Sequence, residues 1–161
     1  MAETVYDFSL KTLQGGPFPL ADLCGQPLLI VNTASQCGFT PQYAGLQALQ
    51  TTWGSQEGGL VIIGVPSNDF GNQEPGEAAA ISVFCERNYG VTFAMMEKTH
   101  VKGAEAHPLF RWLGEQAGFL GKPRWNFYKY LTRRDGTLAA WFSSKTAPDS
   151  PKLQRAIEAV V

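Results

Sequence analysis

Hydrophobic positions along the chain fall into blocks that predict alternating strands and helices. Residues 28–32 (LLIVN) and 60–65 (LVIIGV) are continuous apolar runs, which are typical of strands covered on both faces of a sheet. Between them, Leu46, Leu49 and Trp53 recur at helical spacing. A strand, a helix and a second strand in this order predict a parallel pair at the centre of an α/β sheet.

The segments on either side of this unit predict a layered fold. Apolar residues flank the glycine-rich turn at residues 14–16, which indicates an N-terminal β-hairpin. The other expected elements are helices over residues 77–89 and 107–116, a last helix capped by Ser150 and Pro151, and antiparallel strands over residues 127–132 and 137–142. Together they predict a thioredoxin-like α/β fold, with a central mixed sheet flanked by helices, in one domain over residues 1–161.

Composition narrows the partners of this domain. The chain has 161 residues, 44% of them hydrophobic, and a net charge of -1 without runs of like charge, so we do not expect it to bind nucleic acid. No apolar stretch approaches the roughly 20 residues that cross a bilayer, and the first ten residues do not resemble a signal peptide. We therefore expect a cytoplasmic protein without stable membrane association.

The cysteines are few and odd in number. Cys24, Cys37 and Cys85 fit neither a disulfide-rich scaffold nor a zinc-binding spacing. His100 and His107 lie seven residues apart without a neighbouring ligand pattern, and we interpret them as surface or structural histidines. We expect no metal and no cofactor, and the cysteines are left as candidates for thiol chemistry.

Cys37 is the strongest of these candidates. It lies in the polar loop at residues 33–40, which follows the first central strand. In α/β proteins, reactive groups are commonly found just beyond the carboxyl ends of such strands. Thr40 and Pro41 predict the N-cap and first residue of a helix, whose positive end should favour a nearby thiolate. Residue 40 is not a cysteine, so thiol–disulfide exchange within a Cys-x-x-Cys motif is excluded. A small apolar residue in a loop is the alternative interpretation of Cys37.

Three segments in order resemble the motifs of glutathione peroxidases. They are residues 32–43 (NTASQCGFTPQY), 68–76 (NDFGNQEPG) and 125–131 (WNFYKYL). The resemblance runs from about Tyr6 to the last helix. It implies a catalytic tetrad of Cys37, Gln73, Trp125 and Asn126.

The resemblance also implies a role for each member of the tetrad. The Cys37 thiolate attacks a hydroperoxide and becomes a sulfenic acid. The side-chain N–H groups of Gln73, Trp125 and Asn126 stabilise charge on the thiolate and on the leaving oxygen. Without the motifs, Gln73 would be interpreted as a solvated loop amide and Trp125 as a core aromatic residue.

Cys85 matches the position at which cysteine-type members of the family carry a resolving cysteine, which closes the catalytic cycle as a disulfide with Cys37. Since Cys85 is expected on a helix, over residues 77–89, that helix would have to unwind in part. A core position is the alternative for Cys85. Cys24 has no such match and is interpreted as a packing residue or bystander.

The second motif departs from the family pattern at two positions. Ser67 and Asp69 stand where cysteine and glutamine are frequent in the family. Neither change affects the tetrad, and the loss of that cysteine removes a rival resolving thiol. Cys24 and Cys85 are then the two thiols within the chain that could pair with Cys37.

The resemblance thus implies a peroxidase that reduces hydrogen peroxide and organic hydroperoxides, including those of lipids, with thioredoxin as the reductant. Glutathione, acting on a one-cysteine peroxidase, is the alternative reductant. A redox sensor that relays oxidation to a partner protein and a thiol–disulfide oxidoreductase are the alternative functions. The short segment at residues 107–125 lacks the insertion that tetrameric family members use, so we expect a monomer.

Overall fold

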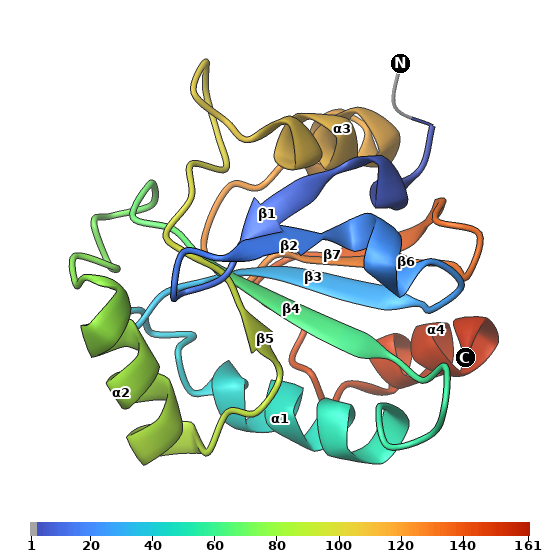
Figure 1. Ribbon diagram of the computed structural model, residues 1–161, viewed down its shortest axis with the longest axis horizontal. Coiled ribbons are helices and arrows are strands. Elements are labelled where there is room, and N and C mark those ends of the chain that lie inside the picture. The colour runs from blue at the N-terminus through green and yellow to red at the C-terminus, as the bar shows by residue number, and fades with distance from the viewer. Residues whose placement is uncertain (1–2) are drawn as a thin grey trace.

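A mixed five-stranded sheet organises the chain (Figure 1). The computed structural model describes residues 3–161. Its strand order is β5-β4-β3-β6-β7, in which β3 pairs in parallel with β4 and antiparallel with β6. The strands are β3 (Leu28–Thr33), β4 (Val61–Pro66), β5 (Ala94–Met95), β6 (Lys129–Thr132) and β7 (Leu138–Phe142). The helices are α1 (Gln42–Trp53), α2 (Ala78–Tyr89), α3 (Pro108–Ala117) and α4 (Pro151–Val160).

The N-terminal hairpin forms a sheet of its own. Its strands are β1 (Ser9–Lys11) and β2 (Pro17–Pro19), which pair antiparallel. A bridge between Thr12 and Met96 joins the hairpin to the segment after β5. The fold class predicted from the sequence, a thioredoxin-like α/β fold with a mixed sheet, flanking helices and this hairpin, is confirmed.

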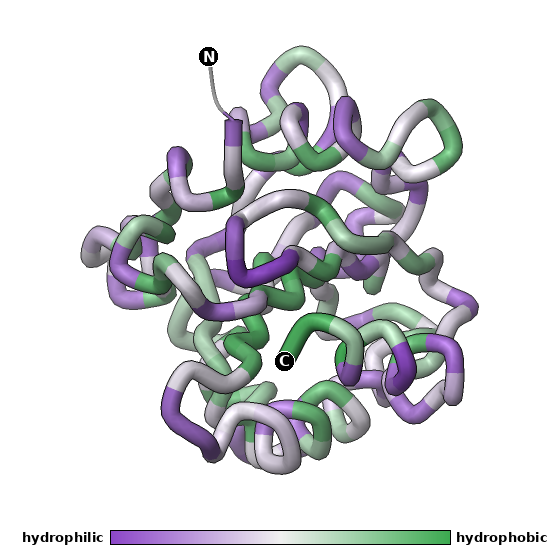
Figure 2. The backbone as a smooth tube through the Cα atoms, turned by 90° about the vertical axis from the view of Figure 1, so that its right-hand side faces the viewer, coloured by the Kyte–Doolittle hydropathy of each residue, from purple (hydrophilic) through white to green (hydrophobic). Residues whose placement is uncertain are grey.

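Alternate residues of the central strand enter two different cores. Leu29 and Val31 of β3 pack with apolar side chains of α1, α2 and α4. Leu28 and Ile30 pack instead with α3 and the hairpin. Because side chains alternate across a strand, a strand that is buried on both faces must be apolar throughout. Figure 1 shows α1 on one side of the sheet and α3 on the other, and in Figure 2 most of the hydrophobic stretches gather toward the middle of the molecule.

Local signals explain where the helices begin and end. Gly90 ends α2 with φ +60, a left-handed conformation that favours glycine. Ser150 Oγ accepts the Leu153 N–H at the start of α4. His107 Nδ1 accepts the Leu109 N–H at 3.0 Å, so this histidine is a helix cap. No helix within residues 3–161 has both the length and the apolar character needed to cross a membrane.

Candidate active site

The three motif segments meet at one end of the sheet, beyond the carboxyl ends of its central parallel strands. The loops that follow β3 and β4 leave the carboxyl ends of two parallel neighbours, and the Gln36 N–H donates to the Gln73 carbonyl at 2.9 Å across them. The third motif enters β6, which is antiparallel to β3, with Lys129 opposite Val31. Its first residues therefore lie beside the end of β3. This topology brings together residues that are 93 positions apart in the sequence, such as Asn32 and Trp125.

Cys37 lies in a tight turn and is 7% exposed. Its Sγ accepts the Phe39 N–H at 3.3 Å. Its own N–H donates to Thr40 Oγ1 at 2.9 Å, and the Thr40 hydroxyl donates to the Ala34 carbonyl at 2.8 Å. The predicted N-cap role of Thr40 is therefore wrong. The Thr40 hydroxyl closes the Cys37 turn instead, and α1 begins after Pro41 without a side-chain cap.

Gln73 and Asn126 are joined by their side chains. Asn126 Nδ2 donates to Gln73 Oε1 at 3.0 Å. Since this bond occupies the oxygen end of the Gln73 amide, its nitrogen end is oriented away from Asn126 as a donor. Asn126 is fully buried, and its Oδ1 has no partner. Buried side-chain oxygens without a hydrogen bond are uncommon in folded proteins.

Asn32, at the end of β3, holds the third motif in place. Its Nδ2 donates to the Trp125 carbonyl at 2.8 Å, and its Oδ1 accepts the Tyr128 N–H at 3.0 Å. Its carbonyl also accepts the Phe127 N–H. No role was assigned to Asn32 from the sequence, although a buried polar residue at the end of an apolar strand is itself a signal.

A buried lysine stabilises the backbone of the third motif at Phe127. Phe127 has φ +63, a region that bulky residues rarely adopt, and its carbonyl accepts Lys129 Nζ at 2.8 Å. Lys129 also donates to the Ser143 carbonyl at 3.3 Å. Burial lowers the pKa of Lys129 to about 7. The side chain of Lys129 thus fixes an unfavourable backbone conformation directly after Asn126.

Trp125 is half-buried beside a cavity of about 410 Å³. The lining residues are Phe39, Trp125, Tyr128, Ser143, Ser144 and Lys145. The Trp125 ring packs on Phe70, with 6.1 Å between ring centroids. The cavity gives this face of the site an opening to a small molecule or to a protruding partner side chain.

Gly71 provides the space that the Trp125 ring occupies. A Cβ atom on residue 71 would lie 2.9 Å from Cη2 of Trp125, closer than carbon atoms pack. Gly71 also has φ +67. Gly103 has a similar φ of +74, but nothing lies within 4 Å of its Cβ position. Comparing alanine substitutions at these two glycines therefore distinguishes the effect of backbone strain from the effect of displacing the Trp125 ring.

We expect Gly71→Ala to lower kcat/KM for hydroperoxide by roughly 10- to 100-fold, because the Trp125 ring must move. Gly103→Ala carries a similar backbone strain, about 1–2 kcal/mol, and should leave activity unchanged. Peroxide consumption and urea unfolding of both variants provide the measurement. Equal activity in the two variants would show that the position of the Trp125 ring is unimportant.

Cys85 lies in α2, as predicted, and is 3% exposed. It belongs to the same apolar cluster as Cys37, and both thiols are free. Burial raises the pKa of Cys85 to about 11, an effect that the Tyr43 hydroxyl opposes and the charge of Glu74 reinforces. Cys24 is also free but exposed. Of the two interpretations of Cys24, bystander fits this position and packing residue does not.

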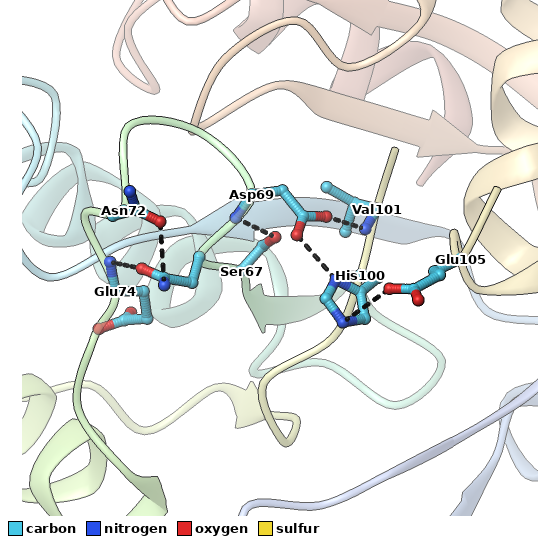
Figure 3. A network of polar contacts seen from close by, with 8 residues as sticks. Ser67, Asp69, Asn72, Glu74, His100, Val101 and Glu105 are labelled. Atoms are coloured by element: carbon cyan, nitrogen blue, oxygen red, sulfur yellow. Dashed lines mark hydrogen bonds and ion pairs between the residues drawn. The ribbon is translucent and has the colours of Figure 1, made fainter. Parts of the chain in front are cut away.

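The departure from the family pattern at Asp69 has a structural explanation (Figure 3). Its carboxylate accepts the Val101 N–H at 2.7 Å and contacts His100 Nδ1 at 2.8 Å. His100 Nε2 lies 3.6 Å from Glu105. Asp69 therefore fastens the second motif to the segment around residues 100–105. Within residues 3–161, no three His, Cys, Asp or Glu side chains come together as metal ligands.

The two histidines should give stability a maximum near pH 6.5. The hydrogen bond to Asp69 raises the pKa of His100 above its ordinary 6.5, so its contribution is complete below pH 6.5 and is lost as the pH rises through the folded-state pKa. Burial lowers the pKa of His107, so stability increases as the pH rises toward 6.5. The Asp69 carboxylate is retained throughout this range, since hydrogen bonds from Val101 and His100 outweigh burial and lower its pKa.

We expect His100→Asn to remove the decline in stability above pH 6.5 and His107→Asn to remove the rise below it. Urea unfolding of each variant between pH 5 and 8 measures both slopes, and each variant serves as the control for the other. A decline above pH 6.5 that persists in His100→Asn would contradict the assignment.

Comparison with known proteins identifies the family. A family model described as glutathione peroxidase matches residues 5–114. A glutathione peroxidase-like peroxiredoxin, GPX5 of Chlamydomonas reinhardtii, is 48% identical over 158 residues, which cover 96% of each chain. The hydroperoxy fatty acid reductase gpx1 of Synechocystis sp. is 49% identical over 154 residues, which cover 91% of this chain and 90% of that one.

Solved structures agree. The crystal structure of Trgpx in its apo form superposes with a TM-score of 0.77 at 33% identity, over 98% of this chain and 97% of that one. A secreted disulfide oxidoreductase of Mycobacterium tuberculosis has a TM-score of 0.66 at 19% identity, over 98% and 99% of the two chains, and shares the fold alone. With three motif segments joined at one end of the sheet around a buried thiol, and with relatives of this similarity over nearly its whole length, the chain belongs to the glutathione peroxidase family and is a peroxidase.

Proposed function

We propose that this chain reduces hydrogen peroxide and organic hydroperoxides at Cys37, with Gln73, Trp125 and Asn126 as its catalytic partners. The observation that carries the proposal is the meeting of the Cys37 turn with the bonded Gln73–Asn126 pair at the ends of β3 and β4. Such fixed amides can stabilise developing charge without reorganisation.

The first half-reaction is a nucleophilic substitution at oxygen. The Cys37 thiolate attacks the terminal peroxide oxygen, an S–O bond forms, and the O–O bond breaks with its electron pair on the departing oxygen. That oxygen takes a proton and leaves as water or an alcohol, while Cys37 becomes a sulfenic acid. The Gln73 amide nitrogen and the Trp125 indole N–H are the donors proposed for the departing oxygen.

The second half-reaction in this proposal joins Cys37 to Cys85. Buried and protonated, Cys85 cannot react from its position in an intact α2. The helix is suited to open locally, because only Ile81 and Cys85 of its twelve residues are buried and Val83 is 49% exposed. Cys85 also lines a cavity of about 190 Å³, together with residues of α2 and of the hairpin turn.

Thioredoxin is proposed as the protein that reduces this disulfide. Two carboxylates of glutathione would need cationic partners, and Lys145 is the one charged side chain among those lining the cavity beside Trp125. A relative named peroxiredoxin and another named hydroperoxy fatty acid reductase support a thiol-based cycle and lipid hydroperoxide substrates, respectively. We also propose that the enzyme is a monomer and acts in the cytoplasm, where thiols are kept reduced between turnovers.

Steady-state consumption of hydrogen peroxide and cumene hydroperoxide, with thioredoxin or glutathione as the sole reductant, tests this function. We expect turnover with both peroxides and thioredoxin, and at least tenfold slower turnover with glutathione. A thioredoxin without its two active-site cysteines is the matched control and should support no turnover. Rapid turnover with glutathione alone would show that glutathione, and not thioredoxin, is the reductant.

A further inference from the structure

Glu74 is a buried acid with no structural partner for one of its oxygens. Among residues 3–161 it is the single buried acidic side chain, at 1% exposure, and its Oε2 accepts no hydrogen bond. Its backbone N–H donates to Asn68 Oδ1 at 2.9 Å, and Figure 3 shows its side chain well apart from the Asp69–His100 pair. A buried carboxyl is costly without partners, so its presence points to a function.

The Glu74 carboxyl lies near the segments that carry both thiols. Ser35, two residues before Cys37, lies against it, and the charge of Glu74 also acts on Tyr43 and Cys85. Burial raises the pKa of Glu74, and Ser35 and Lys98 offset this only in part. The titratable groups around the carboxyl are thus Tyr43 from α1, Cys85 from α2 and Lys98 from the segment after β5.

Other unpartnered polar atoms gather at the same place. The buried oxygens without a hydrogen bond include Thr33 Oγ1, Ser35 Oγ and Tyr43 Oη, in addition to Glu74 Oε2. The Tyr43 hydroxyl lies beside the Thr33 hydroxyl and the Cys85 thiol, though neither contact has hydrogen-bond geometry. These hydroxyl groups and the Glu74 carboxyl are able to accept and donate protons near the two thiols.

The step that joins the two cysteines needs a proton acceptor and a proton donor. Cys85 must lose a proton before its sulfur attacks, and the hydroxide that leaves the Cys37 sulfenic acid must gain one. The net reaction of the thiol and the sulfenic acid gives a disulfide and one water, so a single group that moves one proton is sufficient.

We propose that Glu74 moves this proton. While α2 is intact, its carboxylate takes the proton of the Cys85 thiol, and the resulting thiolate attacks the Cys37 sulfur when the helix opens. The S–S bond forms, the S–O bond breaks with its electron pair on oxygen, and the protonated Glu74 then delivers the proton to the departing hydroxide. Glu74 returns to its starting state. This inference rests on the proposed two-cysteine function.

Rapid-quench experiments with one equivalent of hydrogen peroxide separate the two half-reactions. Dimedone labelling follows the Cys37 sulfenic acid, and intact-mass analysis follows the loss of two hydrogens in the disulfide. In Glu74→Gln, which keeps the shape of the side chain, we expect disulfide formation to slow about 100-fold while Cys37 oxidation keeps its rate. Glu74→Asp, which keeps the acid, should recover part of the loss.

Glu86→Gln is the matched control, because it removes an exposed carboxylate next to Cys85 in the sequence. It should form the disulfide at the wild-type rate. Disulfide formation at the wild-type rate in Glu74→Gln contradicts the role of Glu74 alone. Failure of wild-type Cys37 to form a sulfenic acid, or formation of the acid without a Cys37–Cys85 link, contradicts the proposed function itself.

The pH dependence of the wild type gives a second measurement, which does not require a folded variant. Because the carboxylate must be ionised to accept the thiol proton, the rate of disulfide formation should rise with pH through one ionisation above the ordinary carboxyl value of 4.5 and then level off. A rate that increases only with thiol ionisation at alkaline pH would contradict the proposal.

Discussion

Cys37→Ser is expected to lower peroxide turnover by roughly 1,000-fold or more, because a hydroxyl in place of the thiolate is a far weaker nucleophile. Serine is close to cysteine in size, so the turn closed by Thr40 should persist. Stopped-flow measurement of the first peroxide reaction, without any reductant, isolates this effect from the rest of the cycle.

Cys24→Ser is the matched control for this experiment, since Cys24 is free and exposed. Its peroxide turnover should equal that of the wild type. Substantial turnover in Cys37→Ser, or its loss in Cys24→Ser, would place the reacting thiol elsewhere. Equal melting temperatures of the three proteins would exclude unfolding as the cause of any loss.

Cys85→Ser is expected to lower thioredoxin-dependent turnover by roughly 100-fold or more while the first oxidation of Cys37 keeps its wild-type rate. The physical reason is that thioredoxin would then have to attack a sulfenic acid on the buried residue Cys37, instead of a disulfide opened by the movement of α2. The measurement compares single-turnover oxidation with steady-state turnover in the same preparation.

Ser82→Ala on the same helix is the control for the effect of substitution in α2. It changes another small side chain beside the cavity at Cys85 and should retain turnover. If Cys85→Ser keeps full thioredoxin-dependent turnover, Cys85 is a core residue and the reductant attacks Cys37 directly.

The sequence was sufficient for the fold because each central element has a strong local signal. The apolar runs of β3 and β4 and the Gly90 stop signal of α2 predicted these elements to within one or two residues. By contrast, β5 (Ala94–Met95) is only two residues long and pairs with β4 alone. A segment this short has no hydrophobic pattern from which a strand could be predicted. Such an element exists because of its neighbours and not because of its own pattern.

The candidate site was predicted only in part, for a similar reason. The motif segments predicted Cys37, Gln73 and Asn126 as site residues, and the structure brings the segments that carry them together. Asn32 supports the site through a backbone group that is distant in the sequence, and Lys129 through a backbone carbonyl in a strained conformation. No local sequence pattern predicts contacts of these kinds. The sequence allowed the Thr40 hydroxyl to cap the helix, but in the structure it accepts the Cys37 N–H and closes the Cys37 turn.

Peptide mapping by mass spectrometry after one equivalent of hydrogen peroxide tests the two-cysteine mechanism most directly. The reduced protein is oxidised, alkylated and digested without reduction, in parallel with Cys85→Ser. We expect a single disulfide-linked peptide pair containing Cys37 and Cys85, which is absent from the variant. A product in which Cys85 is fully alkylated, with Cys37 oxidised alone or linked to Cys24, would contradict it.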